Sequence, residues 1–339
     1  MHPSLPRQDL PAPGHGSPTL VIPAYNRGAL IEDTLRSAVR QTRPFAEIIV
    51  VDDGSTDDTA ARVERFAAQR PDGRIRLIRT RNQGVQAARN TGVRAAGTEL
   101  VALCDSDDLL EPAYCATVTG WMESHPGTDI LYCNFTPFDE NGDHPDKFSG
   151  APSGFFDGAV RTGNFLECVP DLYRRSLSYQ PLFPTGLVTR AAFYRAIGGY
   201  DTAFNGVGAE DWEFTLRAIA HGRVALCAAS LIRIRKHAGN DSRDSMRMAI
   251  GEALILEHGL AHHPGAATAE PVIRQSILKR RHGAFDAAFA RGDFGIAKDM
   301  LRLLGSPASS AKFRLKRFIV DTPGFARHLL WKLSQQLTA

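Results

Sequence analysis

The chain of 339 residues is long enough for one large α/β domain and a smaller second part, since domains usually hold ~50 to 250 residues. With 43% hydrophobic and 23% charged residues it can bury a core, which excludes wholesale disorder and a fibrous repeat. The 40 Lys and Arg residues against 37 Asp and Glu give a formal charge of +3, too low for a dedicated nucleic-acid-binding protein.

The cysteines and the apolar runs bear on the compartment in which the protein works. The number of cysteines is odd and none has C-x-x-C spacing, which argues against a disulfide framework or a zinc ribbon; they are Cys104, Cys115, Cys133, Cys168 and Cys227. No run approaches the ~18 apolar residues of a membrane span, and five prolines interrupt the first 18 residues. We expect a cytoplasmic protein with a disordered lead over residues 1–17.

From Thr19 onward, short apolar runs alternate with longer amphipathic stretches, the pattern of a parallel sheet covered by helices. Apolar residues recur at helical spacing over residues 30–39 and 60–67. The order predicts an α/β fold with a mainly parallel sheet sandwiched by helices, in which ligands bind at the carboxyl ends of the strands. The predicted strands span residues 19–22, 47–51, 74–78, 99–104 and 129–132.

Local signals predict the ends of these helices. Ser55, followed three residues later by Asp58, is typical of a capping box at the start of the second helix. Gly97 is predicted to end the third helix, and Pro112 to be the first residue of the fourth. These ends leave the acidic motifs in the turns that follow the strands.

The sequence changes character after residue 133. Residues 134–180 are rich in Gly, Pro, Asp and Phe and show little period, which predicts a long, partly irregular connection of the kind that often forms binding loops. A helix over residues 211–221, ended by Gly222, precedes an apolar run over residues 224–234.

Beyond about residue 246 only helical segments are predicted, including residues 269–290 and 294–304. We therefore place a boundary near residue 245. It separates an α/β domain over residues 18–245 from a smaller all-helical C-terminal region over residues 246–339.

Asp52-Asp53-Gly54-Ser55 directly follows an apolar strand, so two carboxylates stand at a strand end beside the start of a helix. Carboxylates there can accept hydrogen bonds from a base N–H or a ribose hydroxyl. A polar turn with an N-cap explains the same residues equally well, because Asp and Ser favour such positions. Both interpretations stay open from these residues alone.

Asp105-Ser106-Asp107-Asp108 follows the predicted strand over residues 99–104 in the same way. Three acids in four residues repel one another in a cleft unless a cation offsets them, which indicates a divalent metal. A solvated acidic turn is the alternative. The position at the end of a buried strand favours the functional interpretation.

Glu210-Asp211 opens the helix over residues 211–221, where acids complement the helix dipole without any functional role. Four preceding glycines, at positions 198, 199, 206 and 208, suggest a flexible loop that delivers this pair to a site. His237 follows a basic run, but a single histidine among 11 is more often a surface or core residue.

In their order and spacing, five motifs together resemble glycosyltransferase family 2. They are Val21-Ile22-Pro23-Ala24-Tyr25-Asn26, Val50-Val51-Asp52-Asp53-Gly54-Ser55, Gln83-Gly84 with Ala88-Arg89-Asn90, Asp105-Ser106-Asp107-Asp108, and Glu210-Asp211. The resemblance covers residues 18–245 and implies a GT-A fold, a nucleotide-sugar donor that is usually UDP-linked, a Mg²⁺ or Mn²⁺ ion, and inversion at the anomeric carbon. It also implies a nucleotide-sugar-binding half over residues 18–133 and an acceptor-binding half over residues 134–245.

The resemblance further implies donor-side roles for individual residues. Tyr25 and Asp53 would contact the nucleobase, with Pro23 and Asp52 nearby. Arg89 would lie on the nucleotide side. Asp105 would hold the ribose or the sugar, with Ser106 beside it.

The metal and acceptor roles are carried over in the same way. Asp107 would coordinate the metal that bridges the diphosphate, and His237 would complete its shell. Asp211 would be the general base, with Glu210 and Trp212 on the acceptor side. Such a metal stabilises charge on the leaving diphosphate, and a carboxylate can accept the proton of the attacking hydroxyl. The implied acceptor is a glycan or lipid-linked hydroxyl, as in polysaccharide or glycoconjugate synthesis.

Other classes of protein with this kind of sheet would carry different motifs. A sugar-1-phosphate nucleotidyltransferase would carry a Gly-rich basic loop after the first strand, where this chain has Ala24-Tyr25-Asn26-Arg27. A dehydrogenase would carry G-x-G-x-x-G at the same place, and that motif is absent there. A non-catalytic nucleotide-sugar- or glycan-binding protein would keep the fold without the chemistry, but the intact Asp107 and Asp211 argue against it.

The last helices carry a further pattern. Residues 306–339 hold six basic residues and one acidic residue, a net charge of +5. Apolar residues are interleaved with these charges, which predicts docking on an anionic membrane surface or a partner. A helical cap packed on the catalytic domain is the alternative. The apolar residues are Phe313, Leu315, Phe318, Ile319, Leu329, Leu330 and Trp331.

Overall fold

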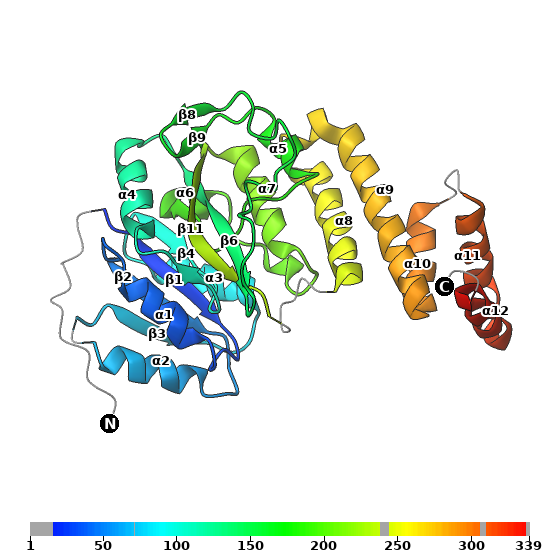
Figure 1. Ribbon diagram of the computed structural model, residues 1–339, viewed down its shortest axis with the longest axis horizontal. Coiled ribbons are helices and arrows are strands. Elements are labelled where there is room, and N and C mark those ends of the chain that lie inside the picture. The colour runs from blue at the N-terminus through cyan, green and yellow to red at the C-terminus, as the bar shows by residue number, and fades with distance from the viewer. Residues whose placement is uncertain (1–15, 71, 238–243, 306–309, 337–339) are drawn as a thin grey trace. The chain divides into compact units, whose positions relative to one another are not determined.

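The computed structural model describes residues 16–70, 72–237, 244–305 and 310–336 (Figure 1). The chain divides into two compact units, each described here by itself. The first comprises Met1–Asn205 and Phe214–Ala238 and contains the sheet, whereas the second comprises Gly206–Glu213 and Gly239–Ala339 and is helical. This division falls earlier than the boundary expected near residue 245, and it groups residues 206–213 with the helical unit.

The described strands form one mixed sheet in which the longer strands pair parallel. Its order is β3-β2-β1-β4-β10-β6-β11-β9-β8, with β5 paired to β11 and β7 to β6. The strands are β1 (Thr19–Ala24), β2 (Glu47–Asp52), β3 (Ile75–Arg79), β4 (Leu100–Leu103), β5 (Leu109–Leu110), β6 (Ile130–Asp139), β7 (Gly142–Asp143), β8 (Val160–Thr162), β9 (Phe165–Glu167), β10 (Val188–Arg190) and β11 (Val224–Arg235).

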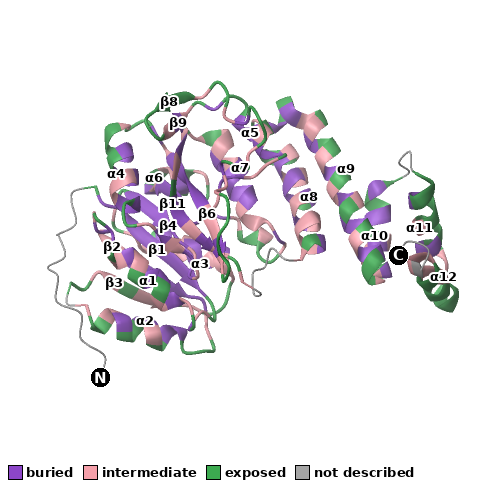
Figure 2. Cartoon of the chain, viewed as in Figure 1, coloured by how far each residue is buried: buried purple, intermediate pink, exposed green. Residues whose placement is uncertain are grey.

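Helices cover both faces of this sheet, as the sequence predicts. Side chains of α1, α2 and α4 pack in one core on one face, and those of α3, α6 and α7 pack in a second core on the other. The strands between them are buried on both faces (Figure 2), which suits their runs of Val, Ile and Leu. These helices are α1 (Ile31–Val39), α2 (Thr59–Ala68), α3 (Val85–Ala95), α4 (Tyr114–Ser124), α5 (Leu172–Ser176), α6 (Ala191–Ala196) and α7 (Glu210–His221).

The connection expected over residues 134–180 is only partly irregular. Its first six residues extend β6 well beyond the predicted strand, which was placed at residues 129–132. The extension exists because β6 pairs along its length with β11, up to the Phe138 and Arg235 pair. The rest of the segment holds the short strands β7, β8 and β9 and the short helix α5.

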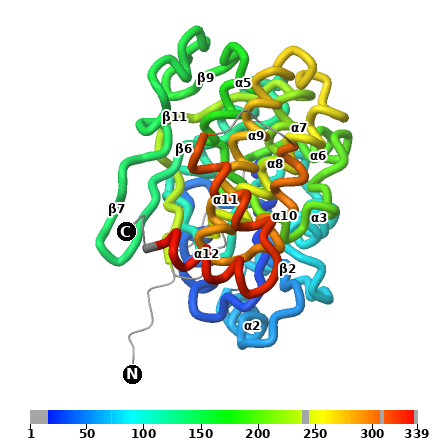
Figure 3. Tube along the Cα trace, turned by 90° about the vertical axis from the view of Figure 1, so that its right-hand side faces the viewer, coloured from blue at the N-terminus to red at the C-terminus, as the bar shows by residue number. Residues whose placement is uncertain are grey.

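The second unit is built from helices. Its core combines aliphatic and aromatic side chains, among the latter Phe285, Phe289 and Phe294, with Trp331 packed against it. Figures 1 and 3 show α10, α11 and α12 lying side by side. No helix among the described residues is long and apolar enough to cross a membrane. The helices are α8 (Ser245–His262), α9 (Ala266–Arg291), α10 (Phe294–Leu304), α11 (Ala311–Asp321) and α12 (Gly324–Gln336).

Three predicted helix ends are wrong. α2 begins at Thr59 without a side-chain cap from Asp58, and Ser55 instead accepts a hydrogen bond from the Asn26 N–H at 2.9 Å. α3 ends at Ala95, and its C-cap is Ala96 rather than the predicted Gly97. α4 begins at Tyr114, two residues after Pro112.

The predicted disordered lead lies almost wholly outside the described residues. Its last residue, Ser17, is described, and there the prediction is wrong. Ser17 is buried, and its hydroxyl oxygen accepts a hydrogen bond from Arg43 Nε at 3.2 Å.

Candidate functional site

The carboxyl ends of β1, β2 and β4 meet at one edge of the sheet, because these neighbouring strands run parallel (Figure 1). The two acidic motifs follow β2 and β4 and therefore share this edge. β11 reaches the same edge through β5, where Ile232 pairs with Leu110 in an antiparallel ladder. Continuing that register places Arg235 opposite Asp107, and His237, two residues further on, lies with its imidazole beside the Asp107 carboxylate.

Asp53 organises the loop between β3 and α3. Its carboxylate is 3% exposed and accepts hydrogen bonds from the backbone N–H groups of Gln83 at 3.0 Å and Gly84 at 2.6 Å. The Thr80 hydroxyl donates to it as well, at 3.1 Å. The expected nucleobase contact of Asp53 stays a prediction, but most of its hydrogen-bonding capacity serves the protein's own backbone.

Asp52 is fully buried and turns back on its own loop. One oxygen accepts from the Ser55 N–H at 3.1 Å, and the other lies 3.6 Å from the Arg79 Nε. Gly54, between Asp52 and Ser55, has a φ of 75°, and a Cβ there would approach the Asn82 backbone nitrogen to 2.8 Å. The glycine is therefore required by both its backbone conformation and the close passage of the neighbouring loop.

The loop after β1 presents a tyrosine to solvent. Tyr25 is 44% exposed, and the adjacent Asn26 adopts a left-handed φ of 51°. Asn26 Oδ1 accepts from the Thr56 N–H at 2.8 Å, which ties this loop to the one after β2. Pro23, expected on the donor side, is buried within β1 and shapes the strand that carries Tyr25.

Cationic side chains surround the second acidic motif. Arg89 pairs with Asp105 at 2.7 Å. Asp107 Oδ2 lies 3.0 Å from His237 Nε2 and 3.4 Å from Arg27 Nε. The crowding of acids that the sequence shows is thus offset in part by the protein's own cations, while an Asp oxygen and a His nitrogen stand together as possible metal donors.

Arg89 is held in place by close packing of α3 on the sheet. Gly92, one turn further along α3, lies so close to β1 that a Cβ there would collide with Val21. Arg89 is only 4% exposed. Its guanidinium carbon lies 5.0 Å from the centroid of the Tyr200 ring. Asn90 fixes that tyrosine by accepting its N–H at 2.9 Å and donating to its carbonyl at 2.7 Å.

Asp108 points into the protein rather than toward the site. Burial raises the pKa of Asp108 well above its usual range, and repulsion from Asp107 and Asp105 raises it further. Hydrogen bonds from the Thr185 hydroxyl at 2.6 Å and the Arg235 N–H at 3.0 Å oppose this rise. Asp108 therefore clamps the end of β4 to β11.

Several residues of the site were not predicted. Arg27 and Arg235 had a weak signal, because one follows the first motif and the other precedes His237. Thr185 had no signal in the sequence, because its contact with the acidic motif depends on the pairing of β10 with β4. Ser106 was expected on the donor side and is buried.

The acidic pair expected on the acceptor side begins α7 and belongs to the second unit. Ala209, just before it, has a φ of 56°, which is unfavourable for a residue with a Cβ. Glu210 and Asp211 are partly exposed, and their roles stay predictions. Trp212 is buried with the Arg280 guanidinium 5.0 Å from its ring centroid, and its expected place on the acceptor side stays a prediction.

Taken together, the edge combines an exposed aromatic ring, arginines beside carboxylates, and a carboxylate–imidazole pair. Arginines bind phosphate oxygens, carboxylates accept from ribose or sugar hydroxyls, and an aromatic face stacks on a base. The arrangement suits an anionic ligand with a base and several hydroxyl groups.

Comparisons with known proteins agree in one direction. Residues 19–171 match the family model described as "Glycosyl transferase family 2". Over 170 residues the chain is 34% identical to "Putative glycosyltransferase EpsH" of Bacillus subtilis. This stretch covers 47% of this chain and 47% of the relative. Over 226 residues it is 31% identical to "Validoxylamine A glucosyltransferase" of Streptomyces hygroscopicus subsp. jinggangensis, covering 60% of this chain and 51% of the relative. The chain thus spans about half the length of these curated relatives.

Among solved structures, the fold is similar to S. aureus TarS 1–349 in complex with UDP-GlcNAc. The TM-score is 0.60 at 20% identity, covering 85% of this chain and 82% of the other. The complex of the same fragment with UDP gives a TM-score of 0.57 at 18% identity. At these identities the likeness shows a shared fold.

Proposed function

The chain carries a glycosyl transferase family 2 domain on a GT-A-like sheet, and from this premise we propose that it transfers a sugar from a UDP-linked donor to an acceptor hydroxyl with inversion. The observation that carries the proposal is the meeting of Asp107, His237 and Arg27 at the carboxyl edge of the sheet. That edge is where ligands bind in sheets of this kind.

Donor binding is proposed for the residues on either side of this cluster. The exposed ring of Tyr25 would stack on the base, and the Arg89–Asp105 pair would meet the ribose and the phosphates. Asp53 is proposed to act through the loop that it holds, with its remaining acceptor capacity toward a base N–H. Support comes from the solved structure of similar fold that binds UDP-GlcNAc.

Asp107 and His237 would hold a Mg²⁺ or Mn²⁺ ion. The Asp107 carboxylate supplies the oxygen ligand that such ions prefer, and His237 Nε2, 3.0 Å from that carboxylate, would be the single nitrogen ligand. A bound ion supplies charge stabilisation to the leaving diphosphate. Arg27 lies 3.4 Å from Asp107 and would contribute a second positive charge on the same side.

Asp211 is proposed as the general base. It lies in the first turn of α7, where the helix dipole favours the ionised form. An ionised carboxylate there can accept the proton of the attacking hydroxyl at neutral pH. Glu210 precedes it in the same turn and is the second candidate.

The decisive experiment is a donor screen with the purified full chain. UDP-GlcNAc and UDP-glucose come first, and release of UDP is followed with Mn²⁺, with Mg²⁺ and with EDTA. Asp107→Asn should abolish turnover. Asp139→Asn is the matched control, because Asp139 forms an exposed carboxylate–imidazole pair with His144 at 2.9 Å that has no proposed role.

Each outcome of that screen has a distinct meaning. Full turnover in EDTA contradicts the metal assignment. Binding of UDP without release from any donor supports a non-catalytic binding protein instead. Formation of pyrophosphate from a sugar 1-phosphate and UTP supports a nucleotidyltransferase.

We further propose that the last two helices contact an anionic membrane surface on which a glycan or lipid-linked acceptor is presented, with the protein working at the cytoplasmic face. Phe313 and Ile319 are buried in the core of the helical unit itself, so one side of α11 is already covered. The other side and α12 expose several large apolar side chains next to basic residues. These are Leu315, Phe318, Phe325, Leu329 and Leu333.

Flotation with phosphatidylglycerol-containing vesicles tests this proposal against pure phosphatidylcholine vesicles. The double variant Phe318→Ser and Phe325→Ser should lose binding to the anionic vesicles, because both rings are mostly exposed. Leu303→Ser, on α10 and about half exposed, is the matched control. If the double variant floats like the unmodified chain, the membrane contact is excluded for these helices.

A further inference from the structure

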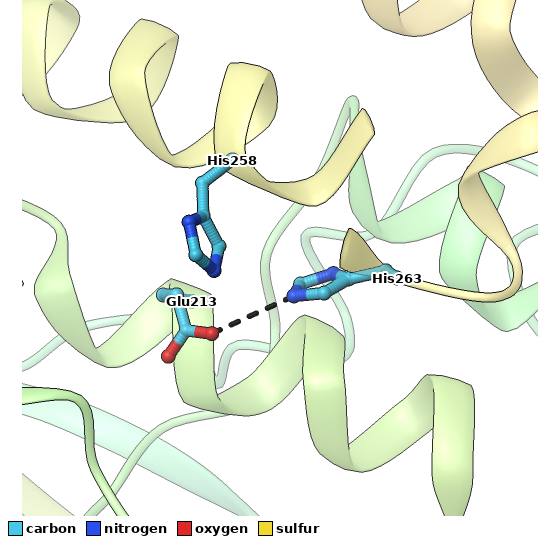
Figure 4. Close-up of side chains that lie close together, drawn as sticks. All are labelled: Glu213, His258 and His263. Carbon is cyan, nitrogen blue, oxygen red and sulfur yellow. Dashed lines mark ion pairs between the residues drawn. The ribbon is translucent and has the colours of Figure 1, made fainter. Parts of the chain in front are cut away.

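The helical unit holds a second group of metal-ligating side chains, distinct from the acidic motifs. Glu213 comes from the first turn of α7, His258 from α8, and His263 from the C-cap of α8. Figure 4 shows the three side chains converging on one point. Each offers one ligand atom, and these atoms all lie within 4.8 Å of one another.

The spacing within the group resembles that of ligands around an ion. Glu213 Oε1 and His263 Nε2 are 3.5 Å apart. A charge-assisted hydrogen bond between such groups is normally ~2.7–2.9 Å. Two ligands of a tetrahedral ion, each at ~2.0–2.1 Å from it, lie about 3.3–3.4 Å apart. The observed separation is therefore closer to that of two ligands sharing an ion.

Burial adds a second argument. The side chains of Glu213 and His263 are each 1% exposed, and His258 is partly exposed. A carboxylate taken out of water is costly unless a positive charge offsets it. A divalent ion bound by the three side chains would place positive charge beside this carboxylate, with water as the fourth ligand of a tetrahedral ion.

The donor set selects among ions. Two imidazole nitrogens and one carboxylate oxygen are typical of Zn²⁺, whereas Mg²⁺ prefers an all-oxygen shell. The Glu213 group therefore differs in its preferred ion from the Asp107 and His237 pair, where Mg²⁺ or Mn²⁺ is proposed. This difference allows the two sites to be tested separately.

The group sits where the chain before α7 is fixed to α8. Arg247 Nε donates to the Gly206 carbonyl at 3.0 Å. A Cβ at Gly251 would collide with the Gly208 carbonyl, so the two backbones are in direct contact. Ala209 holds a left-handed conformation in the same stretch, which persists only where the surroundings impose it.

From these observations we propose that Glu213, His258 and His263 form a zinc site that fixes the first turn of α7. Asp211 lies two residues before Glu213 in that turn, so the ion would set the orientation of the proposed general base. This consequence rests on the proposed function, whereas binding of the ion does not. Glu213 is thus a positioning residue for Asp211.

Metal binding to the full chain is the primary test. After treatment with EDTA and its removal, titration with Zn²⁺ should show one tight site with a Kd below about 1 µM. Co²⁺ in its place should give the intense visible absorption of a four-coordinate ion. A chain that binds no stoichiometric Zn²⁺ at 10-fold excess overturns the proposal.

Variants assign the ligands. Glu213→Gln and His263→Gln should each weaken Zn²⁺ binding by at least about 100-fold and remove the Co²⁺ absorption. His221→Gln is the matched control, because His221 is exposed at the other end of α7. His262→Gln tests the neighbouring histidine, whose ring stacks on His258 with the centroids 4.2 Å apart. Loss of binding in His262→Gln, with binding kept in His263→Gln, would overturn this ligand set. Should His263→Gln fail to fold, His258→Gln at the partly exposed position provides the same readout.

A readout independent of activity tests the positioning role. Removal of Zn²⁺, with Mn²⁺ kept at saturation, should speed amide exchange over residues 206–213 at least tenfold. UDP affinity should stay within about twofold, while transfer falls. Unchanged exchange over this segment overturns the positioning role. If no donor is turned over under any condition, the proposed function fails, but the binding and exchange results still decide the zinc site.

Discussion

The two acidic strand ends look alike in the sequence and differ in the structure. Asp52 ends β2 and Asp53 follows it, and their carboxylates accept hydrogen bonds from the protein's own backbone N–H groups. Asp105 and Asp107 follow β4, and their carboxylates meet cationic side chains, among them Arg89. The first pair is bound into loops, whereas the second is paired with groups that a ligand or ion can replace.

An acidic turn at the end of a strand can therefore have either of two roles. A carboxylate that satisfies backbone donors fixes the shape of a site, and its removal should cost stability first. A carboxylate held by side-chain cations keeps its charge available for an ion, and its removal should cost activity first. The predictions below order these effects.

Asp107→Ala should give the largest effect. Turnover should fall by about 10³-fold or more, because the proposed ion loses a ligand worth several kcal/mol of charge stabilisation in the transition state. The free energy of unfolding should change by less than about 1 kcal/mol, since the side chain is partly exposed and pairs only with side chains. Steady-state kinetics and urea unfolding on one preparation check both. Turnover within tenfold of the unmodified chain contradicts the assignment.

Asp211→Asn should reduce transfer by roughly 10²–10⁴-fold, the usual contribution of a general base. UDP affinity should stay within a few-fold, because the change keeps the shape and removes only the proton acceptor. Calorimetry with UDP and transfer rates separate the two. A lower melting temperature together with weaker UDP binding would indicate a structural role, and near-normal transfer would move the search to Glu210.

Asp53→Asn should lower the free energy of unfolding by about 1–3 kcal/mol. The amide has one acceptor oxygen, so the N–H groups of Gln83 and Gly84 lose part of their acceptor while an NH₂ faces them. UDP binding should weaken as a consequence of the loosened loop. Asp72→Asn, at an exposed turn, is the control. A stable Asp53→Asn that has lost only UDP affinity would place the residue with the second motif.

Asp57→Asn should give the smallest effect. Partial burial raises the pKa of Asp57, but hydrogen bonds from the Thr59 hydroxyl and from the Gly28 and Thr59 N–H groups outweigh this and leave the pKa lowered. An acid whose pKa is lowered by folding adds stability above its unfolded pKa, and that stability is lost as pH falls through the folded value. The variant should cost less than about 1 kcal/mol at pH 7, because the group is largely exposed. In thermal unfolding the cost should shrink as pH falls from 7 through the folded pKa, and a constant cost at all pH values contradicts this.

Local sequence patterns predicted the elements better than their ends. The strand over residues 19–22 and the helix over residues 294–304 agree with β1 and α10, because apolar periodicity directly reports burial of one face. The capping box at Ser55 was wrong because a residue 29 positions away, Asn26, donates to its hydroxyl. Such a partner leaves no trace in the neighbouring sequence.

Periodicity and motif order were enough to predict the sheet, the helices on its faces and the acidic motifs at its carboxyl edge. Which carboxylates bind backbone and which meet cations depends on the folded chain. Folding also brought His237 beside Asp107 across 130 positions, and Glu213 beside His258 and His263. Strand register and helix packing made these contacts, and both are set by the fit of distant surfaces rather than by adjacent residues.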